Sequence, residues 1–514
     1  MATLTSLILI LLSVSLFHSN NVTQAYKILL SVPVSCRSLH NLFTSVALSL
    51  ALANHNVTLI SSFPASAQHD NLHYVYALGE KKYPTDNIFE AQRQVDAFTI
   101  LLNAALFVGE NMWRNAEVLA LWRDRHSFDA VISPSYINEV NLPFLINYTG
   151  NFFLICTPGI EYFAIRNAGN WLSPAVVPYI LLPYDENMTF LERVVNVVTL
   201  VVSRYAIPYF FFSKQEELLR KFFPEFGDVL EYYDRVSLTL INGHPALDNP
   251  VPLLPSQVYI GTINAHLPRP LPMDLEQVMQ SSGDAGVIYF SIGSVAVSKD
   301  IPARAKAAFL EAFARVPQKV LWKYEGDDLK LPDNVVTRSW LPQQDILGHP
   351  KTRLFISHCG NLGTQEAKYH GVPILAVPVA FDQPRNAARM VQKGLALALD
   401  WHTLTADDIV SAIDELVNNT SYSERIQNLS AILKDQMETP QRRAVWHIEH
   451  FIKNQGAPHL HYPGKNLHFL QYICLDVVLF LLLLLYIVCR LSAYFLRAIG
   501  RRVFRINKRK LKTR

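Results

Sequence analysis

Residues 358–384, HCGNLGTQEAKYHGVPILAVPVAFDQP, combine long apolar runs with a few polar side chains at the ends of those runs. The polar residues are His358, Glu366 and the pair Asp382-Gln383. Strands of a doubly wound parallel sheet are buried on both faces, while their carboxyl ends face a ligand. The chemistry expected of these residues therefore depends on whether they follow such strands.

Glycine turns follow two of the expected strands. RLFISH ends at His358 and is followed by Gly360 and an expected helix at 361–370, and VIYFSI is followed by Gly293-Ser294. A glycine lets backbone amides approach a ligand, and the helix after it turns its positive end toward a phosphate. The pattern predicts a site for a phosphate-bearing ligand, with an ordinary ligand-free glycine turn as the alternative.

Two regions alternate apolar strands with helical patterns, which predicts an α/β fold of two parallel sheets with helices on both faces. The first region includes YKILLSVP, VTLISSF, FDAVIS and NFFLICT, and the second includes GVIYFSIGS, KVLWKY, VVTRSW, RLFISH and PILAVPV. Between them, residues 242–272 contain seven prolines and should form a linker running into a terminal strand.

The two ends of the chain resemble targeting and membrane segments. MATLTSLILILLSVSLFHSNNVTQA has the pattern of a signal peptide, with Thr23 and Ala25 before the cleavage point. From Tyr472, about 20 mostly apolar residues are enough to cross a bilayer. From Arg490 onward the chain has ten Lys or Arg and no Asp or Glu, which predicts a cytosolic tail and a lumenal body.

Charge and composition narrow the class of protein further. Because the whole chain is +3 and this tail is +10, the remainder is −7, which argues against nucleic acid as a partner. The ending KLKTR resembles a dilysine retrieval signal of the endoplasmic reticulum, with a plain stop-transfer tail as the alternative.

Sequons at Asn147, Asn187, Asn419 and Asn428 agree with a lumenal body. The five cysteines show neither a disulfide framework nor CxxC metal spacing.

A further apolar stretch, VVNVVTLVVSRYAIPYFFF from Val194, is long enough to suggest a second span. Arg204 in its middle and Pro208 near its end would be costly inside a bilayer. We therefore expect a surface or groove-lining helix, lying against the membrane, in preference to a true span.

Two long stretches of the C-terminal half of the sequence resemble a known protein family. SWLPQQDILGHPKTRLFISHCGNLGTQEAKYHGVPILAVPVAFDQPRNAARMVQKG resembles the signature of the UDP-glycosyltransferases, and the likeness continues through RRAVWHIEHFIKNQGAPHLHYPGKNLHFLQYICLDVVLF, as in membrane-anchored animal UDP-glucuronosyl- and UDP-glucosyltransferases. The resemblance implies a GT-B type fold, two Rossmann-like domains facing a cleft plus a C-terminal transmembrane helix. The expected parts are a signal peptide (1–25), an acceptor-binding domain (26–265), a UDP-sugar-binding domain (266–450), a juxtamembrane segment (451–471), a transmembrane helix (472–493) and a basic cytosolic tail (494–514).

The resemblance also implies roles for the donor-site residues. Trp340 would stack on the uracil beside Gln343, and Glu366 would accept from the ribose hydroxyls. The diphosphate would be bound by Ser294, His358 and Gly360. The sugar hydroxyls would be bound by Asp382 and Gln383. No metal and no cofactor is expected, with UDP-sugar as co-substrate.

The family's chemistry is an inverting displacement in which a histidine takes the proton of the acceptor hydroxyl. His40 in CRSLHNLF is the candidate base, although counting back from ANHNVTLI puts that position at Leu39. Pro134 stands where the family usually has the acid that orients the base, and Glu139 is the candidate replacement.

These features predict an endoplasmic-reticulum enzyme that moves glucose or glucuronic acid from UDP-sugar to a small lipophilic acceptor. The alternative is a catalytically altered member that binds UDP-sugar or a lipophile, suggested by Pro134 and the one-residue shift at His40. Self-association is left open, since membrane-anchored relatives often form homo- or hetero-oligomers.

Overall fold

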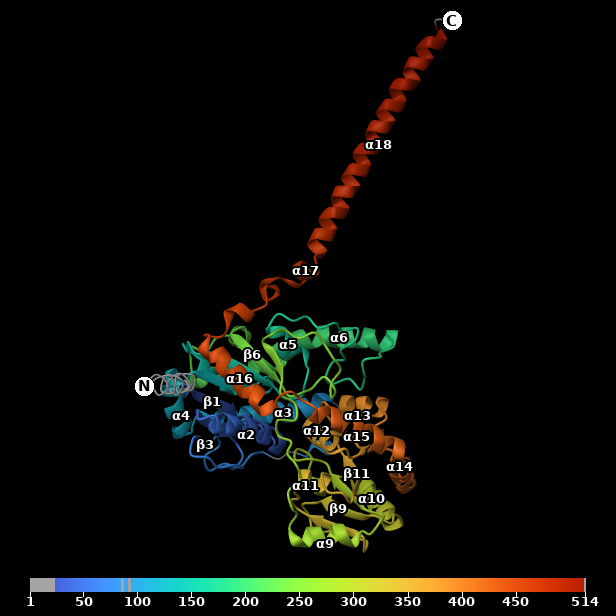
Figure 1. Cartoon of the computed structure of the whole chain (residues 1–514). Helices are drawn as coiled ribbons and strands as arrows, with labels where there is room; N and C mark the ends of the chain where they lie inside the picture. Colours follow the sequence, from blue (N-terminus) through green and yellow to red (C-terminus); the bar gives the residue numbers. More distant parts are fainter. Residues whose placement is uncertain (1–23, 85–86, 91–93, 513–514) are drawn as a thin grey trace, which may run out of the picture. The chain divides into compact units, whose positions relative to one another are not determined.

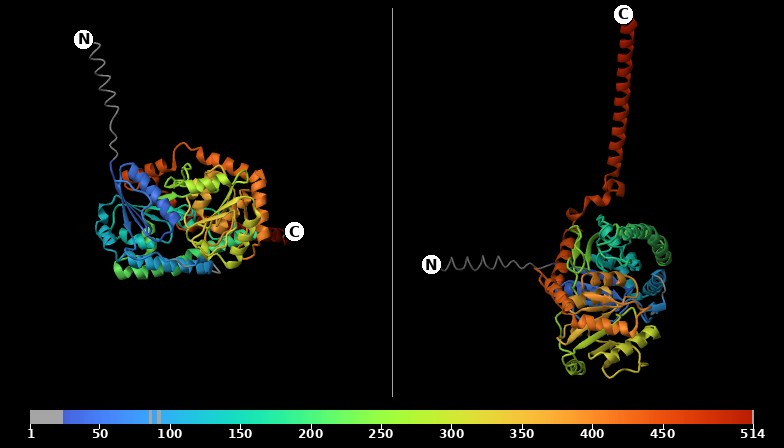
Figure 2. Two further views of the ribbon diagram at one scale, coloured as in Figure 1. Left: turned by 90° about the horizontal axis from the view of Figure 1, so that it is seen from below. Right: turned by 90° about the vertical axis from the view of Figure 1, so that its right-hand side faces the viewer.

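A computed structural model describes residues 24–84, 87–90 and 94–512, so all but the last two residues of the expected signal peptide lie outside it. The chain divides at residue 461 into two compact units. The first unit contains two sheets side by side, as the left view of Figure 2 shows. The expected α/β architecture of two parallel sheets is confirmed.

The first sheet has seven parallel strands in the order β3-β2-β1-β4-β5-β6-β7 among the described residues. Successive residues of β1 enter different cores: Leu30 packs toward α2 and Leu29 toward the opposite face. The strands are β1 (Lys27–Val32), β2 (Asn56–Ser61), β3 (Leu72–Tyr76), β4 (Ala130–Pro134), β5 (Asn151–Cys156), β6 (Val236–Ile241) and β7 (Gln257–Tyr259).

Helices cover both faces of this sheet (Figure 1). The α-helices are α2 (Arg37–Leu52), α3 (Gln94–Met112), α4 (Ala116–Arg123), α5 (Tyr162–Asn167), α6 (Phe190–Ile207), α7 (Ser213–Phe222) and α8 (Val229–Tyr233). The shorter turns are the 3₁₀ helices η1 (Ile88–Glu90), η2 (Arg125–Ser127) and η3 (Glu139–Leu145) and the π-helical η4 (Pro208–Phe212).

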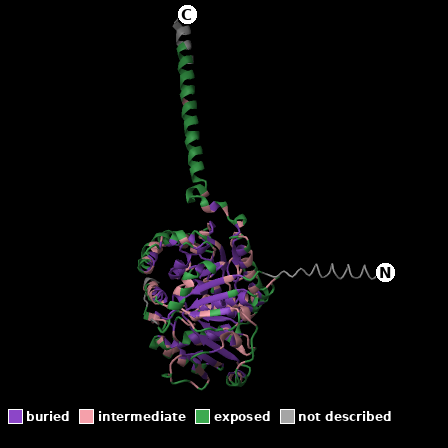
Figure 3. Ribbon diagram, turned by 90° about the vertical axis from the view of Figure 1, so that its left-hand side faces the viewer, coloured by how far each residue is buried: buried purple, intermediate pink, exposed green. Residues whose placement is uncertain are grey.

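The second sheet has six parallel strands in the order β10-β9-β8-β11-β12-β13 among the described residues. They are β8 (Val287–Ser291), β9 (Lys319–Lys323), β10 (Val335–Arg338), β11 (Thr352–Ser357), β12 (Ile374–Ala376) and β13 (Ala396–Ala398). The strands of both sheets are mostly buried, as Figure 3 shows in purple. This explains why their sequences are continuous apolar runs.

The helices of the second domain include the expected helix after Gly360, which is confirmed as α12 (Asn361–His370). The others are α9 (Met273–Ser281), α10 (Ala303–Arg315), α11 (Gln343–Leu347), α13 (Gln383–Gln392), α14 (Ala406–Asn418) and α15 (Thr420–Lys434), with the 3₁₀ turn η5 (Ser298–Asp300).

Helix α16 (Pro440–Lys453) returns to the first domain. Its Ile448 and Phe451 belong to the core formed with α2 and β1, and Glu449 accepts from His55 Nε2 at 2.9 Å. The buried core continues to Ala457, ahead of the turn η6 (Pro458–Leu460). The predicted boundary at residue 450 therefore falls inside a helix of the first domain.

In the second unit, residues 462–514, the described chain is almost entirely helical from Phe469 to Lys512. It consists of η7 (Pro463–Asn466), α17 (Phe469–Tyr472) and α18 (Leu475–Lys512). Residues 475–502 of α18 are long and apolar enough to cross a membrane, with a mean hydropathy of 2.4, and none of them is buried. The helix fits the transmembrane anchor expected from the sequence.

The four expected sequons all carry an exposed asparagine, as a glycan would require. They are Asn147, Asn187, Asn419 and Asn428. The cysteines of the described residues are free, and Cys156 and Cys359 are buried in the first unit.

Candidate functional site

Two glycine turns enclose the ring of His358 at the carboxyl edge of the second sheet. Gly293, which follows β8, has φ +86°, and a Cβ there would lie 2.5 Å from His358 Cε1. A Cβ on Gly360 would lie 2.6 Å from His358 Nε2. Both positions need glycine because any side chain would displace the imidazole. The half-buried Ser294 follows Gly293 in the same turn.

The charges around His358 suit an anionic ligand. Burial, assisted by the Lys323 cation, lowers the pKa of His358 to about 4, so its ring is neutral at pH 7. Its buried Nδ1 has no partner among the described residues. Lys323, the last residue of β9, donates from Nζ to Gly293 O at 3.0 Å and pairs with Glu325. A lysine and an unpartnered imidazole nitrogen thus meet beside two close-packed glycines.

Glu366 is the centre of a cluster of amide donors. Its Oε1 accepts from Asn264 Nδ2 at 3.0 Å and from Gln344 Nε2 at 3.2 Å, and its Oε2 accepts from Gln343 Nε2. Burial raises the pKa of Glu366 to about 7, against the opposing effect of these donors. Gln343 is held in turn by Tyr289, whose hydroxyl donates to Gln343 Oε1 at 3.2 Å. The carboxylate is thereby fixed with its oxygens facing hydrogen-bond donors.

Trp340 stands at the same edge of the sheet with an exposed ring. Its side chain is 58% exposed, so the ring is a surface platform and not part of the core. Two cations approach it, with Lys323 Nζ and Arg37 Cζ each 5.9 Å from the ring centroid. Arg37 belongs to α2 of the first domain, so the two domains meet at this ring.

Asp382 and Gln383 stand at the N-terminus of α13, after Phe381, which has φ 61°. Gln383 Oε1 accepts from the backbone N–H groups of Val379 and Ala380 at 2.8 and 3.0 Å, which leaves its NH₂ group to act as a donor. Asp382 Oδ2 accepts from Asn386 Nδ2 at 2.7 Å, and burial raises the pKa of Asp382.

Hydrogen bonds connect Asp382 and the start of α13 to the turn after β11. Asn386 also donates from Nδ2 to Cys359 O at 3.0 Å, between His358 and Gly360. The structure therefore brings all eight predicted donor-site residues to the loops and helices at the carboxyl edge of the second sheet. They are Ser294, Trp340, Gln343, His358, Gly360, Glu366, Asp382 and Gln383.

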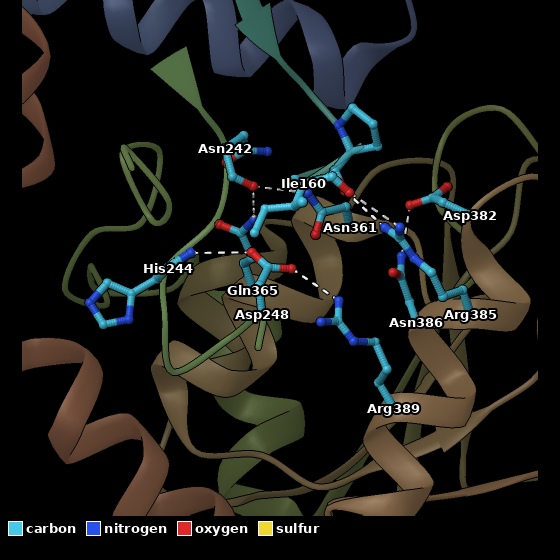
Figure 4. A network of polar contacts seen from close by, with 12 residues as sticks. Ile160, Asn242, His244, Asp248, Asn361, Gln365, Asp382, Arg385, Asn386 and Arg389 are labelled. Carbon is cyan, nitrogen blue, oxygen red and sulfur yellow. Dashed lines mark hydrogen bonds and ion pairs between the residues drawn. The ribbon is translucent and has the colours of Figure 1, made fainter. Parts of the chain in front are cut away.

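Polar contacts join this edge to the first domain (Figure 4). Asn361 Nδ2 donates to Thr157 O at 3.0 Å, and Arg385 donates to the carbonyls of Pro158 and Ile160 at 3.2 and 3.3 Å. All three carbonyls belong to the segment after β5. The carboxyl edges of the two sheets therefore face each other, which is where a two-substrate reaction needs its reactants.

His40, the candidate base, lies inside the first domain and is 0% exposed. Its Nδ1 is 2.8 Å from Ser61 Oγ and its Nε2 is 3.1 Å from Ser66 Oγ. Burial, together with the nearby Arg37 cation, lowers the pKa of His40 to about 4. Both ring nitrogens face hydroxyl groups.

Glu139 does not pair with His40, contrary to expectation. It lies in η3, is 0% exposed, and accepts from Gln215 Nε2 at 2.6 Å and from the Tyr233 hydroxyl at 2.9 Å. Both of its oxygens are therefore engaged in the core beneath the opposite face of the sheet. Burial raises the pKa of Glu139, against the opposing effect of the hydrogen bonds from Gln215 and Tyr233.

Sequence reasoning missed several residues that the structure places at the site. Lys323 ends an apolar strand, and Asn264 and Gln344 supply two of the donors to Glu366. A lysine at the end of KVLWK was a usable signal, because a charge at the carboxyl end of a buried strand faces the ligand edge. Asn264 comes from the proline-rich linker, whose path no local pattern predicts.

Aromatic rings continue from the Asp382 loop into the first domain. The ring of Phe381 is 6.2 Å from that of Phe98 in α3, which is 6.4 Å from that of Tyr136. Tyr136 stacks on Phe211 at 6.5 Å. These rings form an apolar contact that runs from the Asp382 loop of the second domain to α3 and η4 of the first. Among the described residues no group of three or more His, Cys, Asp or Glu could hold a metal ion.

Comparison with known proteins identifies the family. The family model described as "UDP-glucoronosyl and UDP-glucosyl transferase" matches residues 10–510. The chain belongs to this family of UDP-glycosyltransferases. UDP-glucosyltransferase 2 of Dactylopius coccus is 34% identical over 503 residues, 96% of each chain. UDP-glucuronosyltransferase 2B10 of Homo sapiens is 35% identical over 367 residues, 69% of this chain and 67% of its own.

Solved structures share the fold of this UDP-glycosyltransferase. The calicheamicin glycosyltransferase CalG4 matches with a TM-score of 0.54 at 20% identity, covering 84% of this chain and 99% of its own. A UDP-glucose: anthocyanidin 3-O-glucosyltransferase in complex with UDP matches with a TM-score of 0.57 at 15% identity, covering 83% and 99%. The GT-B fold expected from the sequence is confirmed.

Proposed function

We propose that this UDP-glycosyltransferase moves a hexose, glucose or glucuronic acid, from its UDP-sugar to the hydroxyl of a small lipophilic acceptor with inversion at the anomeric carbon. The observation that carries the proposal is the convergence of the eight donor-site residues on one sheet edge facing the first domain. The carboxylate of Glu366 suits the ribose, and the imidazole of His358 between its two glycines suits the diphosphate. The pair Asp382-Gln383 suits the hydroxyls of the sugar.

The donor would bind along that edge from Trp340 to Gln383. In this proposal the uracil stacks on the exposed ring of Trp340 and the ribose hydroxyls donate to Glu366. The diphosphate lies at the two glycine turns, near His358 and Lys323. The sugar hydroxyls meet Asp382 and Gln383 at the N-terminus of α13. No metal enters the proposal, because backbone amides, Lys323 and the helix ends carry the diphosphate charge.

We assign the proton of the acceptor to His40, received through Ser66. The acceptor oxygen attacks the anomeric carbon while the bond from that carbon to the diphosphate oxygen breaks, and UDP leaves with the electron pair. The acceptor proton passes to Ser66 Oγ as the Ser66 proton passes to His40 Nε2, a contact of 3.1 Å. The exposed position of Ser66 supports this route, because His40 itself has no exposed surface.

The proposed setting is the endoplasmic reticulum. Cleavage of the leader, the apolar helix from Leu475 and the basic residues after it would give a single-pass chain with a lumenal body and a cytosolic tail. Exposed sequon asparagines support a lumenal body. Glycosidase treatment of microsomes should therefore shift the size of the protein, and an epitope at the C-terminus should be digested by protease added outside sealed microsomes.

The function is tested with microsomes expressing the full chain, given radiolabelled UDP-glucose or UDP-glucuronate and a panel of phenols and steroids. We expect turnover with one of these donors and a loss of at least about a hundredfold in Asp382→Ala, since a sugar contact that strengthens in the transition state raises kcat. Glu424→Gln, on an exposed face of α15, is the matched control and should keep full turnover.

A UDP-binding assay on the same membranes separates the outcomes. Saturable UDP binding without turnover for any donor would overturn the transfer proposal and identify a UDP-sugar-binding protein. Absence of UDP binding in the folded, glycosylated chain would overturn the assignment of the donor site itself.

A further inference from the structure

An arginine of the first domain stands over the exposed ring at the donor edge of the second domain. The Cζ atom of Arg37, the first residue of α2, lies 5.9 Å from the centroid of the Trp340 ring. It also lies 5.0 Å from the centroid of the Phe63 ring, which belongs to the first domain. The guanidinium therefore meets one aromatic ring from each domain.

The charge of Arg37 has no counterpart within the protein. Burial lowers the pKa of Arg37, and among the described residues neither a carboxylate nor a hydrogen bond opposes that effect. The neighbouring cations differ in this respect, because Lys323 pairs with Glu325 and Arg385 donates to two main-chain carbonyls. A half-buried guanidinium without a partner, set between two domains, indicates that a ligand group completes its contacts.

The Phe63 ring is fixed by other rings of the first domain. It follows β2, and its centroid lies 5.7 Å from that of Tyr83 and 6.0 Å from that of His40. The guanidinium thus packs on a supported ring of its own domain and presents itself to Trp340 in the other. An arginine has a flat face that stacks on aromatic rings and on nucleic-acid bases, which a lysine lacks.

The distance between Arg37 and Trp340 is close to the one that a stacked base needs. Carbon atoms in contact are about 3.5–4.0 Å apart, so a base between an indole and a guanidinium requires roughly 7–8 Å between these two groups. The distance of 5.9 Å in the structure is shorter by roughly 1–2 Å. The long side chain of Arg37 can supply this shift without a rearrangement of either domain.

We propose that Arg37 is a donor-binding residue supplied by the first domain, whose guanidinium stacks on the face of the uracil opposite Trp340. The inference rests on the proposed place of the uracil at Trp340. The base then forms a layer shared by both domains, while the diphosphate is left to Lys323 and the glycine turns. Because Arg37 precedes His40 by three residues on α2, the bound donor also anchors the helix that carries the candidate base.

The test compares three ligands on the full chain in detergent: uridine, UDP, and ribose 5-diphosphate, which has no base. Arg37→Leu should weaken uridine and UDP by the same factor, about tenfold, since a stacked base contributes that much affinity. It should leave ribose 5-diphosphate unchanged. Arg37→Lys should give the same pattern, because an ammonium keeps the charge but has no flat face.

Arg425→Leu is the matched control. Arg425 also stands over a ring, with its Cζ 5.7 Å from the centroid of Tyr422, but it lies on α15. All three ligands should bind this variant as they bind the parent chain.

Trp340→Ala separates a failure of this inference from a failure of the proposed function. UDP binding at the parent affinity in Trp340→Ala would place the base elsewhere and overturn the donor site together with the role of Arg37. Weak UDP binding in Trp340→Ala beside parent affinity in Arg37→Leu would overturn the role of Arg37 alone. An equal loss of UDP and ribose 5-diphosphate in Arg37→Leu would do the same, because the arginine would then act on the diphosphate or on the shape of the site.

Discussion

Asp248 and Arg389 form a buried ion pair that joins the two sheet domains, with 3.1 Å between Asp248 Oδ1 and Arg389 Nη1. Their side chains are 9% and 13% exposed. Asp248 also accepts from the backbone N–H of His244 at 3.3 Å, and a Cβ on Gly243 would lie 2.1 Å from its Oδ2. The carboxylate is therefore packed against the backbone of the first domain and presented to α13.

Asp248→Asn should destabilise the protein, because it leaves the Arg389 charge buried without its counterion and close to Arg385. Removing one member of a buried pair costs roughly 3 kcal/mol of unfolding free energy. Urea unfolding of the full chain in detergent, followed by intrinsic fluorescence, measures the change.

A matched surface pair provides the control for this prediction. Arg315 and Asp407 are 2.7 Å apart but 43% and 84% exposed. Asp407→Asn should therefore cost no more than about 1 kcal/mol. Equal losses of unfolding free energy in Asp248→Asn and Asp407→Asn would show that burial does not strengthen the interdomain ion pair.

Glu366 should make UDP binding depend on pH. Burial raises its pKa to about 7, so without ligand it is largely protonated below pH 7. Ribose hydroxyls that donate to it favour the ionised form, so binding below pH 7 must release a proton. Affinity should rise toward pH 8 and fall by up to about tenfold for each pH unit below 7. Calorimetry in two buffers of different ionisation enthalpy counts the protons.

Glu366→Gln removes the titrating group, so the UDP affinity of this variant should not change between pH 6 and 8. UDP lacking both ribose hydroxyls should bind weakly to the parent chain, without the extra proton release. A parent profile that stays flat from pH 6 to 8 would separate Glu366 from nucleotide binding.

The fold and the donor edge could be predicted because they depend on local patterns. Apolar runs with a glycine turn and a helix mark each strand end, and residues 340–383 hold seven of the eight donor-site positions in one continuous stretch. The orientation of α6 could not be predicted, because Asn196 is held by backbone groups of residues 174–179, which have no regular structure and no sequence pattern that places them.

The geometry around the two candidate catalytic residues could not be predicted from the sequence. Neighbouring residues of a helix point about 100° apart, so moving a histidine from position 39 to position 40 turns its side chain from one face to another. In this chain His40 faces Ser61 of β2 in the core. Glu139 follows Pro134 by five residues, but the turn η3 directs its carboxylate to Tyr233. Closeness in sequence to Pro134 therefore does not predict contact with His40.

Lys323 should contribute to binding of the diphosphate. Its Nζ lies at Gly293 O and beside His358, so a phosphate in the turn would meet this cation. Lys323→Met should weaken UDP about tenfold, the loss expected for one charge-assisted hydrogen bond, and leave uridine unchanged. Lys319→Met, at the start of the same strand β9, is the control and should bind both ligands normally. Equal losses for UDP and uridine would indicate a structural effect.

The Ser66 relay predicts a rate defect without a binding defect. Ser66→Ala removes the hydroxyl between the acceptor and His40 but leaves the imidazole in the core. It should lower kcat by about a hundredfold, the lower end for general-base catalysis, with KM for UDP-sugar unchanged. Ser45→Ala is the control and should behave as the parent. Ser45 lies on α2, where its Oγ donates to Asn41 O at 2.9 Å.

The pH profile distinguishes the relay from a base that titrates near neutrality. His40 must be neutral to accept the proton, and its pKa is lowered to about 4 by burial and Arg37. At saturating UDP-sugar, kcat should therefore stay level from pH 8 to 6 and fall only as pH approaches 4, since an unperturbed histidine would lose activity near 6.5. Full turnover by Ser66→Ala, or a midpoint near 6.5 in the parent, would mean that the acceptor proton leaves by another group.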